Sequence, residues 1–155
     1  MTTDEFNNYL KNIPEQISSV VPDVVAETAT EYYKQTFQKK AFDGDPWVAG
    51  KPKKGGSLLI ASGNMMNSIR PTEVNQQQVV ISAGNQHVNY AKAHNEGVNE
   101  TVTVPAHSRT KNGKTFSVKQ HDKKMNIPKR QFMGESKELN KQIEDRINGF
   151  IDSIL

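Results

Sequence analysis

The chain contains no cysteine, which excludes disulfides and thiolate metal sites. Of its 155 residues only 34% are hydrophobic and 7% aromatic, and the mean hydropathy is −0.72. Such a composition predicts that part of the chain stays unpacked or packs only against a partner. No apolar run approaches the roughly 20 residues of a membrane span, and the N-terminal residues lack the pattern of a signal peptide. We therefore expect one soluble domain, residues 1–155, that does not contact a membrane.

Positive charge is concentrated in one part of the chain. Between residues 101 and 131 there is a single acid, Asp122, and the local balance of +7 leaves −4 for the remainder of a chain whose net charge is +3. This pattern predicts a polyanion or an acidic protein surface as partner. The alternative is a solvated hairpin kept soluble by its lysines. The eight basic residues are Arg109, Lys111, Lys114, Lys119, Lys123, Lys124, Lys129 and Arg130.

Helices are predicted at both ends of the chain. Residues 1–40 show helical periodicity, and Thr3 is a candidate N-cap before two acids. Pro14 predicts a break near Ile13, and Pro22 predicts the start of a second helix. A terminal helix is expected over residues 135–155, with one apolar face formed by Leu139, Ile143, Ile147, Phe150 or Ile151, and Ile154.

Residues 41–56 are predicted to form an irregular, flexible loop, because they are rich in Gly and Pro and have no periodicity. Asp43 and Asp45 are interpreted as turn formers rather than metal ligands. Trp47, the only tryptophan, is expected to anchor the loop on the body or on a neighbour. Partner contacts are expected from Trp47, Lys53 and Lys54.

Residues 57–134 are predicted to hold the sheet, a short helix and a hairpin. Strands are expected from Ile69 to about residue 74 and over 78–83, with a helix over 90–97. Two alternating segments, 101–106 and 115–119, flank an Asn-Gly pair typical of a type I′ turn. Pro105 places the first of these strands at a sheet margin.

A strap at residues 127–136 connects this region to the terminal helix. Pro128 restricts the backbone, Phe132 offers apolar area, and Gly134 permits a sharp change of direction. We expect these residues to hold the terminal helix against the sheet. The guanidinium of Arg130 is suited to a carboxylate inside the fold or on an adjacent subunit, whereas Lys129 is expected to face outward.

No catalytic constellation emerges. None of the serines lies in a Gly-x-Ser-x-Gly elbow, and the histidines at 87, 94, 107 and 121 form no His-x-x-x-His pair. The lysines before Gly55-Gly56 lack the ending of a phosphate loop. We therefore expect neither an enzyme nor a protein that binds a cofactor or a metal.

Four motifs occur in a characteristic order: Phe-Asp-Gly-Asp-Pro-Trp at 42–47, Leu-Ile-Ala-Ser-Gly-Asn-Met-Met-Asn-Ser-Ile at 59–69, Tyr-Ala-Lys-Ala-His-Asn-Glu-Gly at 90–97, and Ile-Pro-Lys-Arg-Gln-Phe-Met-Gly at 127–134. Together they resemble the phage virion morphogenesis, or tail completion, family over about residues 37–150. Two features depart from the family pattern: Met65 stands where Leu is usual, and residues 101–126 are longer than the usual connection. The matching positions include Ser62, Gly63, Ile69, Tyr90, His94, Gly97, Pro128, Phe132 and Gly134.

The resemblance implies a structural virion protein of a tailed phage or prophage, assembled in the host bacterial cytoplasm. It implies a tail completion or head-tail joining subunit that forms a ring with neck or tail tube proteins. The implied fold is α+β, a small antiparallel sheet packed by an N-terminal helical segment and a C-terminal helix, from which we expect the basic hairpin to project. The motif residues would build the fold, and residues 43–56 and 101–124 would contact partners. The alternative is a nucleic-acid-binding module that uses residues 101–131, and weak DNA contact is compatible with both.

Overall fold

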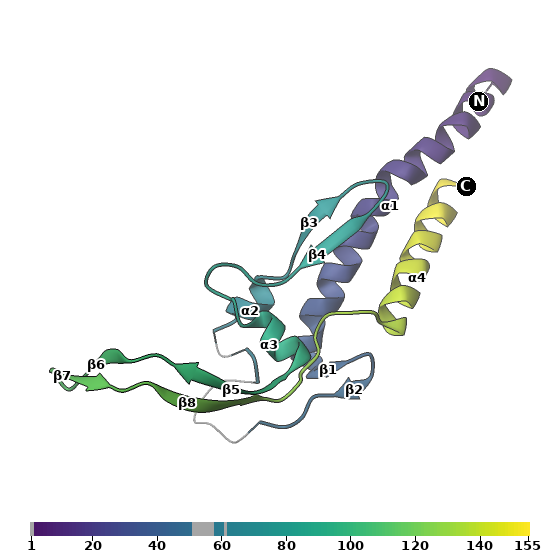
Figure 1. Cartoon of the computed structure of the whole chain (residues 1–155). Helices are drawn as coiled ribbons and strands as arrows, with labels where there is room; N and C mark the ends of the chain where they lie inside the picture. The colour runs from purple at the N-terminus through teal and green to yellow at the C-terminus, as the bar shows by residue number, and fades with distance from the viewer. Residues whose placement is uncertain (1, 51–57, 61) are drawn as a thin grey trace.

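The computed structural model describes residues 2–50, 58–60 and 62–155 (Figure 1). Its helices are α1 (Thr3–Lys39), α2 (Asn64–Asn67), α3 (Ala91–Glu96) and α4 (Lys137–Ile154). Its strands are β1 (Ala41–Phe42), β2 (Asp45–Pro46), β3 (Arg70–Val74), β4 (Val79–Ser82), β5 (Val98–Val104), β6 (His107–Lys111), β7 (Lys114–Val118) and β8 (His121–Ile127). The predicted α+β class is confirmed.

The described strands form separate two-stranded antiparallel ladders, which pair β1 with β2, β3 with β4, β5 with β8, and β6 with β7. The expected small antiparallel sheet is therefore present as several separate ladders. Each ladder is a local hairpin or part of one. None of the described strands pairs with more than one other strand. Both strands of the β3–β4 ladder contact α1, as expected for the sheet that packs on the N-terminal helix (Figure 1).

Helix α1 is continuous, which corrects two predictions. Both Pro14 and Pro22 lie inside it, so the expected break and second helix are absent. A proline inside a helix removes one backbone hydrogen bond, a loss that a helix can accommodate by bending. The N-cap is Thr2 and not Thr3. The Thr2 hydroxyl accepts from the Glu5 amide and the Glu5 carboxylate accepts from the Thr2 amide, a capping box that requires this spacing of three.

The start of the predicted loop is ordered as a hairpin. Strands β1 and β2 pair across Asp43 and Gly44, whose φ angles are 49° and 86°. Positive φ at both central residues is the requirement of a type I′ turn, which an Asp-Gly pair meets at low cost. The irregular-loop prediction is therefore wrong for residues 41–46, whereas the interpretation of Asp43 as a turn former is confirmed. Residues 51–57, with Lys53 and Lys54, lie outside the described part of the chain.

The hydrophobic core lies on both sides of the C-terminal half of α1. One cluster surrounds Phe37, which is fully buried, and the other surrounds Tyr32. Phe132 brings the strap into the first cluster, and Leu139 brings α4 into the second. The remaining buried members of the two clusters are Met65, Ile69, Val88, Ala91, Ala29 and Phe42.

Helix α4 lies along α1 in the opposite direction, so that the C-terminus lies beside the N-terminal half of α1 (Figure 1). Arg146 makes ion pairs with Glu31 at 2.6 Å and Glu27 at 3.6 Å, and the Tyr9 hydroxyl donates to the carbonyl of Ile154. The predicted terminal helix is confirmed. Its apolar face is buried at Leu139 and half-buried at the later positions.

Candidate assembly surface: a basic arm and its strap

Residues 98–127 form a single long hairpin, here called the arm. Val104 pairs with His121 and His107 pairs with Val118, so the β5–β8 and β6–β7 ladders share one register, with two residues of each strand between them. The arm projects away from the helices (Figure 1). The predicted hairpin is thus confirmed, and its two strands reach back to the body. Pro105 lies in the interruption between β5 and β6, where its missing N–H breaks no ladder bond.

The end of the arm has two different faces. Residues directly opposite each other in an antiparallel ladder share a face, and successive residues alternate. Arg109 therefore lies beside Phe116, and Lys111 beside Lys114, on what we call the cationic face. Within the β6–β7 ladder, the opposite face carries only Ser and Thr side chains. Phe116 is 44% exposed, so the cationic face also offers apolar area.

Asn112 and Gly113 form the turn at the end of the arm, with φ angles of 52° and 75°. These values confirm the predicted type I′ turn. We call residues 105–120 the arm tip. The tip carries four exposed basic residues and no acid, whereas the whole arm carries six basic residues and two acids. The basic residues of the whole arm are Arg109, Lys111, Lys114, Lys119, Lys123 and Lys124.

The base of the arm is clamped where α3 ends and the strap begins. Gly97 caps α3 with a φ of 79°, and a Cβ placed there would meet the backbone nitrogen of Lys129 at 3.0 Å. A larger residue at this position would push the strap away. The Arg130 amide donates to the carbonyl of His94 at 2.8 Å. The two ends of the arm are therefore held side by side on the body.

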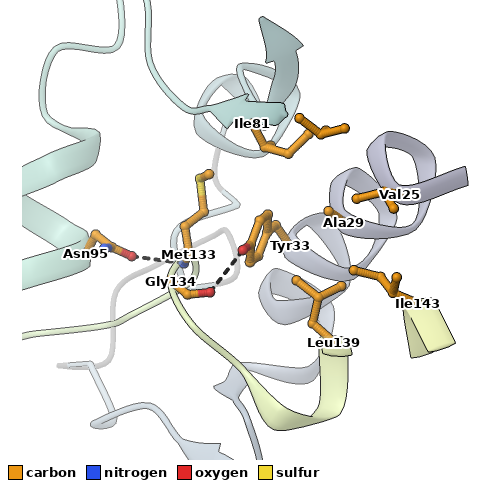
Figure 2. A pocket seen from close by; sticks show the side chains of 10 residues that line it. Val25, Ala29, Tyr33, Ile81, Asn95, Met133, Gly134, Leu139 and Ile143 are labelled. Atoms are coloured by element: carbon orange, nitrogen blue, oxygen red, sulfur yellow. Dashed lines mark hydrogen bonds between the residues drawn. The ribbon is translucent and has the colours of Figure 1, made fainter. Parts of the chain in front are cut away.

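The strap has no regular structure after Ile127, yet side chains from several elements hold its backbone. The amides of Phe132 and Met133 both donate to Oδ1 of Asn95, at 2.9 and 3.0 Å. The Tyr33 hydroxyl donates to the carbonyl of Gly134 at 2.9 Å. Figure 2 shows Asn95 and Tyr33 reaching the strap from opposite sides. Burial raises the pKa of Tyr33, although the bond to Gly134 acts in the other direction.

Trp47 holds the strap from the loop side. Its Nε1 donates to the carbonyl of Gln131 at 2.6 Å, and its ring packs edge-on against Phe37 with centroids 5.5 Å apart. This confirms the expectation that Trp47 anchors its loop. The anchor lies on the chain's own body, and Trp47 is half-buried there. Its role in partner contact stays a prediction.

Arg130 is 7% exposed and does not contribute to a surface charge. Its Nε donates to the carbonyl of Val48 at 3.1 Å, and no described carboxylate lies within ion-pair distance of it. Inside the described fold, then, Arg130 binds a carbonyl oxygen rather than the expected carboxylate. Lys129 is exposed, as predicted. The basic segment 101–131 is therefore divided between an exposed arm and a buried strap residue.

His94 lies beneath the strap, next to Arg130. Burial and then the charge of Arg130 lower its pKa, which favours the neutral imidazole. Its Nδ1 is buried and has no hydrogen-bond partner among the described residues. Tyr90 packs edge-on against the ring at 5.8 Å. That His94 chiefly builds the fold stays a prediction.

The remaining motif residues lie in the body around this region. Gly63 adopts a φ of 68° before α2, Ile69 is 1% exposed, and Pro128 is exposed at the start of the strap. Ser62 is exposed and its hydroxyl lies 3.5 Å from the amide of Asn64. Gly63 thus lies at a turn and Ile69 in the core, whereas Ser62 and Pro128 are exposed.

A cap at the start of α4 was not predicted from the sequence. The Ser136 hydroxyl accepts from the Leu139 amide, and Asp43 Oδ1 accepts from the Glu138 amide at 2.9 Å and from Ser136 at 2.8 Å. The Glu138 amide first, and then Ser136, lower the pKa of Asp43. A serine before a helical pattern is itself an N-cap signal. Asp43, distant in the sequence, carried no such signal.

An apolar groove of about 490 Å³ lies beside the strap, between α1, β4 and α4 (Figure 2). Tyr33 and Asn95 supply its polar groups. Within the described residues, no three His, Asp or Glu side chains gather as a metal ion would need. None of the described helices combines the length and the apolar character that crossing a bilayer requires. The apolar side chains of the groove include Val25, Ala29, Ile81, Met133, Leu139 and Ile143.

A sequence model of the phage virion morphogenesis family matches residues 3–151. The chain belongs to this family. The match to the phage virion morphogenesis family includes the start of α1 and most of α4, and is longer than the predicted resemblance over 37–150. It also includes the whole arm. Neither the curated proteins nor the solved structures gave a significant match.

Proposed function

We propose that this chain is a tail completion or head-tail joining subunit that assembles into a ring with neck or tail tube proteins. Membership in the phage virion morphogenesis family gives it a structural or assembly role in a phage. On this proposal it acts in the virion after assembly in the bacterial cytoplasm, and its role is structural rather than catalytic.

The observation that carries the proposal is the arm. A two-stranded ladder is marginally stable in water, since it has no third strand or helix to pack against. The arm nevertheless extends over residues 98–127, and among the described elements its strands contact chiefly each other. Its base is fixed by the bond from Arg130 to His94 and by the close approach at Gly97. A rigidly mounted, otherwise unsupported arm suits a subunit that completes its packing against neighbours.

Light scattering coupled to size-exclusion chromatography tests the ring. The mass is measured for the chain alone and with candidate neck and tail tube proteins, and negative-stain images show whether the assembled species is a closed ring. We expect an oligomer under at least one of these conditions. A persistent monomer under all of them would count heavily against the proposal.

A second candidate function is binding to DNA. It is favoured by the arm tip, with its four exposed basic residues and no acid. Phosphate contacts release counterions, so such binding weakens steeply as salt rises from about 50 to 200 mM. A mobility-shift assay with duplex DNA at about 50 mM salt decides: the absence of any shift would remove this candidate.

A further inference from the structure

A strongly acidic surface lies at the end of the molecule opposite the arm. We define the acidic helix end as residues 3–31 of α1 and 144–154 of α4. These two segments lie together, because Arg146 binds Glu27 and Glu31, and the Tyr9 hydroxyl reaches the carbonyl of Ile154. They contain nine acids and only two basic residues, Lys11 and Arg146.

Most of this negative charge is exposed and is not neutralised within the chain. Arg146 pairs with Glu27 and Glu31, and none of the other acids makes an ion pair with a described residue. The remaining seven acids, all exposed, are Asp4, Glu5, Glu15, Asp23, Glu144, Asp145 and Asp152. The chain is therefore polarised, with a basic arm tip and an acidic helix end at opposite extremes (Figure 1).

The two extremes also match in their apolar groups. The cationic face of the arm tip carries Phe116, 44% exposed, among its basic side chains. The acidic helix end carries Tyr9 and Leu10, which are 38% and 45% exposed. Protein interfaces commonly combine such aromatic and aliphatic contacts with complementary charge around them. The acidic helix end thus offers apolar area and a charge opposite to that of the cationic face.

We propose that the cationic face of the arm tip of one subunit docks on the acidic helix end of a neighbouring copy of the same chain. This inference rests on the proposed ring and names the contact that closes it. The contact joins two different surfaces, so it is heterologous, and a heterologous contact generates a ring when its rotation closes. Every subunit carries both surfaces and gives its arm to one neighbour while accepting an arm from the other.

The observations favour a second copy over a nucleic acid as the partner of the arm. A polyanion would use only the arm tip and would leave the seven exposed acids of the acidic helix end without a partner. A second copy uses both extremes at once. Because the charges are exposed, their attraction is screened over about 8 Å at physiological salt, and the association should weaken as salt is raised.

Charge reversal provides the test, with the full-length chain throughout. An arm-reversed variant replaces the three basic residues of the cationic face: Arg109→Glu, Lys111→Glu, Lys114→Glu. A helix-reversed variant replaces three acids of α4: Glu144→Lys, Asp145→Lys, Asp152→Lys. A control has the same change of charge as the helix-reversed variant, at exposed acids outside both surfaces: Asp45→Lys, Glu73→Lys, Glu135→Lys.

The arm-reversed variant places like charges on its two surfaces, and the helix-reversed variant reduces the net charge of the acidic helix end from −7 to −1. We therefore expect the self-association of each variant to weaken at least about tenfold, which corresponds to about 1.4 kcal/mol. In an equimolar mixture, the reversed arm tip can meet the α4 segment 144–154, whose net charge changes from −2 to +4, and the unmodified arm tip meets the unmodified helix end, so the oligomer should recover. A chain with all six reversals should also assemble. The control should assemble like the unmodified chain. Masses come from light scattering, and circular dichroism verifies that each variant is folded.

Three results would overturn the inference. If the unmodified chain assembles and the arm-reversed variant assembles equally well, the ring stands and this contact is wrong. If both variants lose assembly but the mixture does not recover it, the two surfaces do not meet. If the arm-reversed variant loses duplex DNA binding while assembly is unchanged, the arm contacts nucleic acid instead. An unmodified chain that stays monomeric in every condition would contradict the proposed ring itself.

Discussion

The arm and the strap follow each other in the chain, and they are stabilised in opposite ways. The strap buries Phe132 and Arg130 and binds Asn95, Tyr33 and Trp47 through its backbone. The arm satisfies its own backbone through its ladder and leaves most side chains exposed. The strap therefore has its partners inside the chain, whereas the arm presents groups that a partner can bind.

The largest expected difference between the two regions comes from a pair of phenylalanines. Phe132→Ala should lower the free energy of unfolding by about 3–5 kcal/mol, because it empties a fully buried position in the core. Phe116→Ala on the arm should change it by less than about 0.5 kcal/mol, since that ring is partly exposed. Urea unfolding followed by circular dichroism compares the two. Equal losses would contradict the assignment of the arm as an unsupported region.

Two adjacent basic residues at the start of the strap should differ less in the stability lost on substitution by alanine. Arg130→Ala should cost about 1–3 kcal/mol, because it removes a charged donor to the Val48 carbonyl together with buried packing. Lys129→Ala is the matched control, and a change within about 0.5 kcal/mol is expected for this exposed residue. Thermal unfolding measures both. If Lys129→Ala cost as much, the boundary between buried strap and exposed surface would be misplaced.

A serine at the end of the strap and a serine on the arm should also differ in the stability that each hydroxyl contributes. Ser136→Ala should lower stability by about 1 kcal/mol, because the hydroxyl caps α4 at the Leu139 amide. Ser117→Ala on the arm removes an exposed hydroxyl for which the structure shows no hydrogen bond, so urea midpoints should barely move. A stronger effect at Ser117 than at Ser136 would show that the arm is stabilised within the chain after all.

The smallest predicted effect depends on pH. The pKa of Asp43 is lowered in the fold from its ordinary 3.8, so its ionised form stabilises the cap of α4. This contribution is complete above that ordinary value and is lost as the pH falls through the lower pKa of the folded state. Asp43→Asn should therefore be less stable than the unmodified chain at pH 6 but closer to it at pH 3. A difference of the same size at both pH values, in urea midpoints, would contradict the assigned role.

Local sequence signals predicted much of this fold because the groups involved are close in the chain. The Asn112-Gly113 turn, the helix ending at Gly97 and the apolar face of α4 all follow from periodicity or turn chemistry over a few residues. The same logic failed at Pro14 and Pro22. There, the local preference of proline for a helix start did not prevent one continuous helix. The Asp-Gly signal at residues 43–44 was present, but composition alone had suggested an irregular loop.

The candidate surfaces show even more clearly which features local sequence determines and which depend on the tertiary structure. Residue types alone established a basic segment, a tail completion resemblance and a strap with Pro128 and Gly134. Only the tertiary structure decided that Arg130 is buried while the other basic side chains of the segment are exposed. It also decided that Asp43 caps α4 together with Ser136, which lies 93 residues later in the chain. Finally, it brought the acids of two distant helices together on one surface. Local preferences act between neighbours in the chain, whereas burial, capping from a distance and the summation of charge depend on segments that only folding brings together.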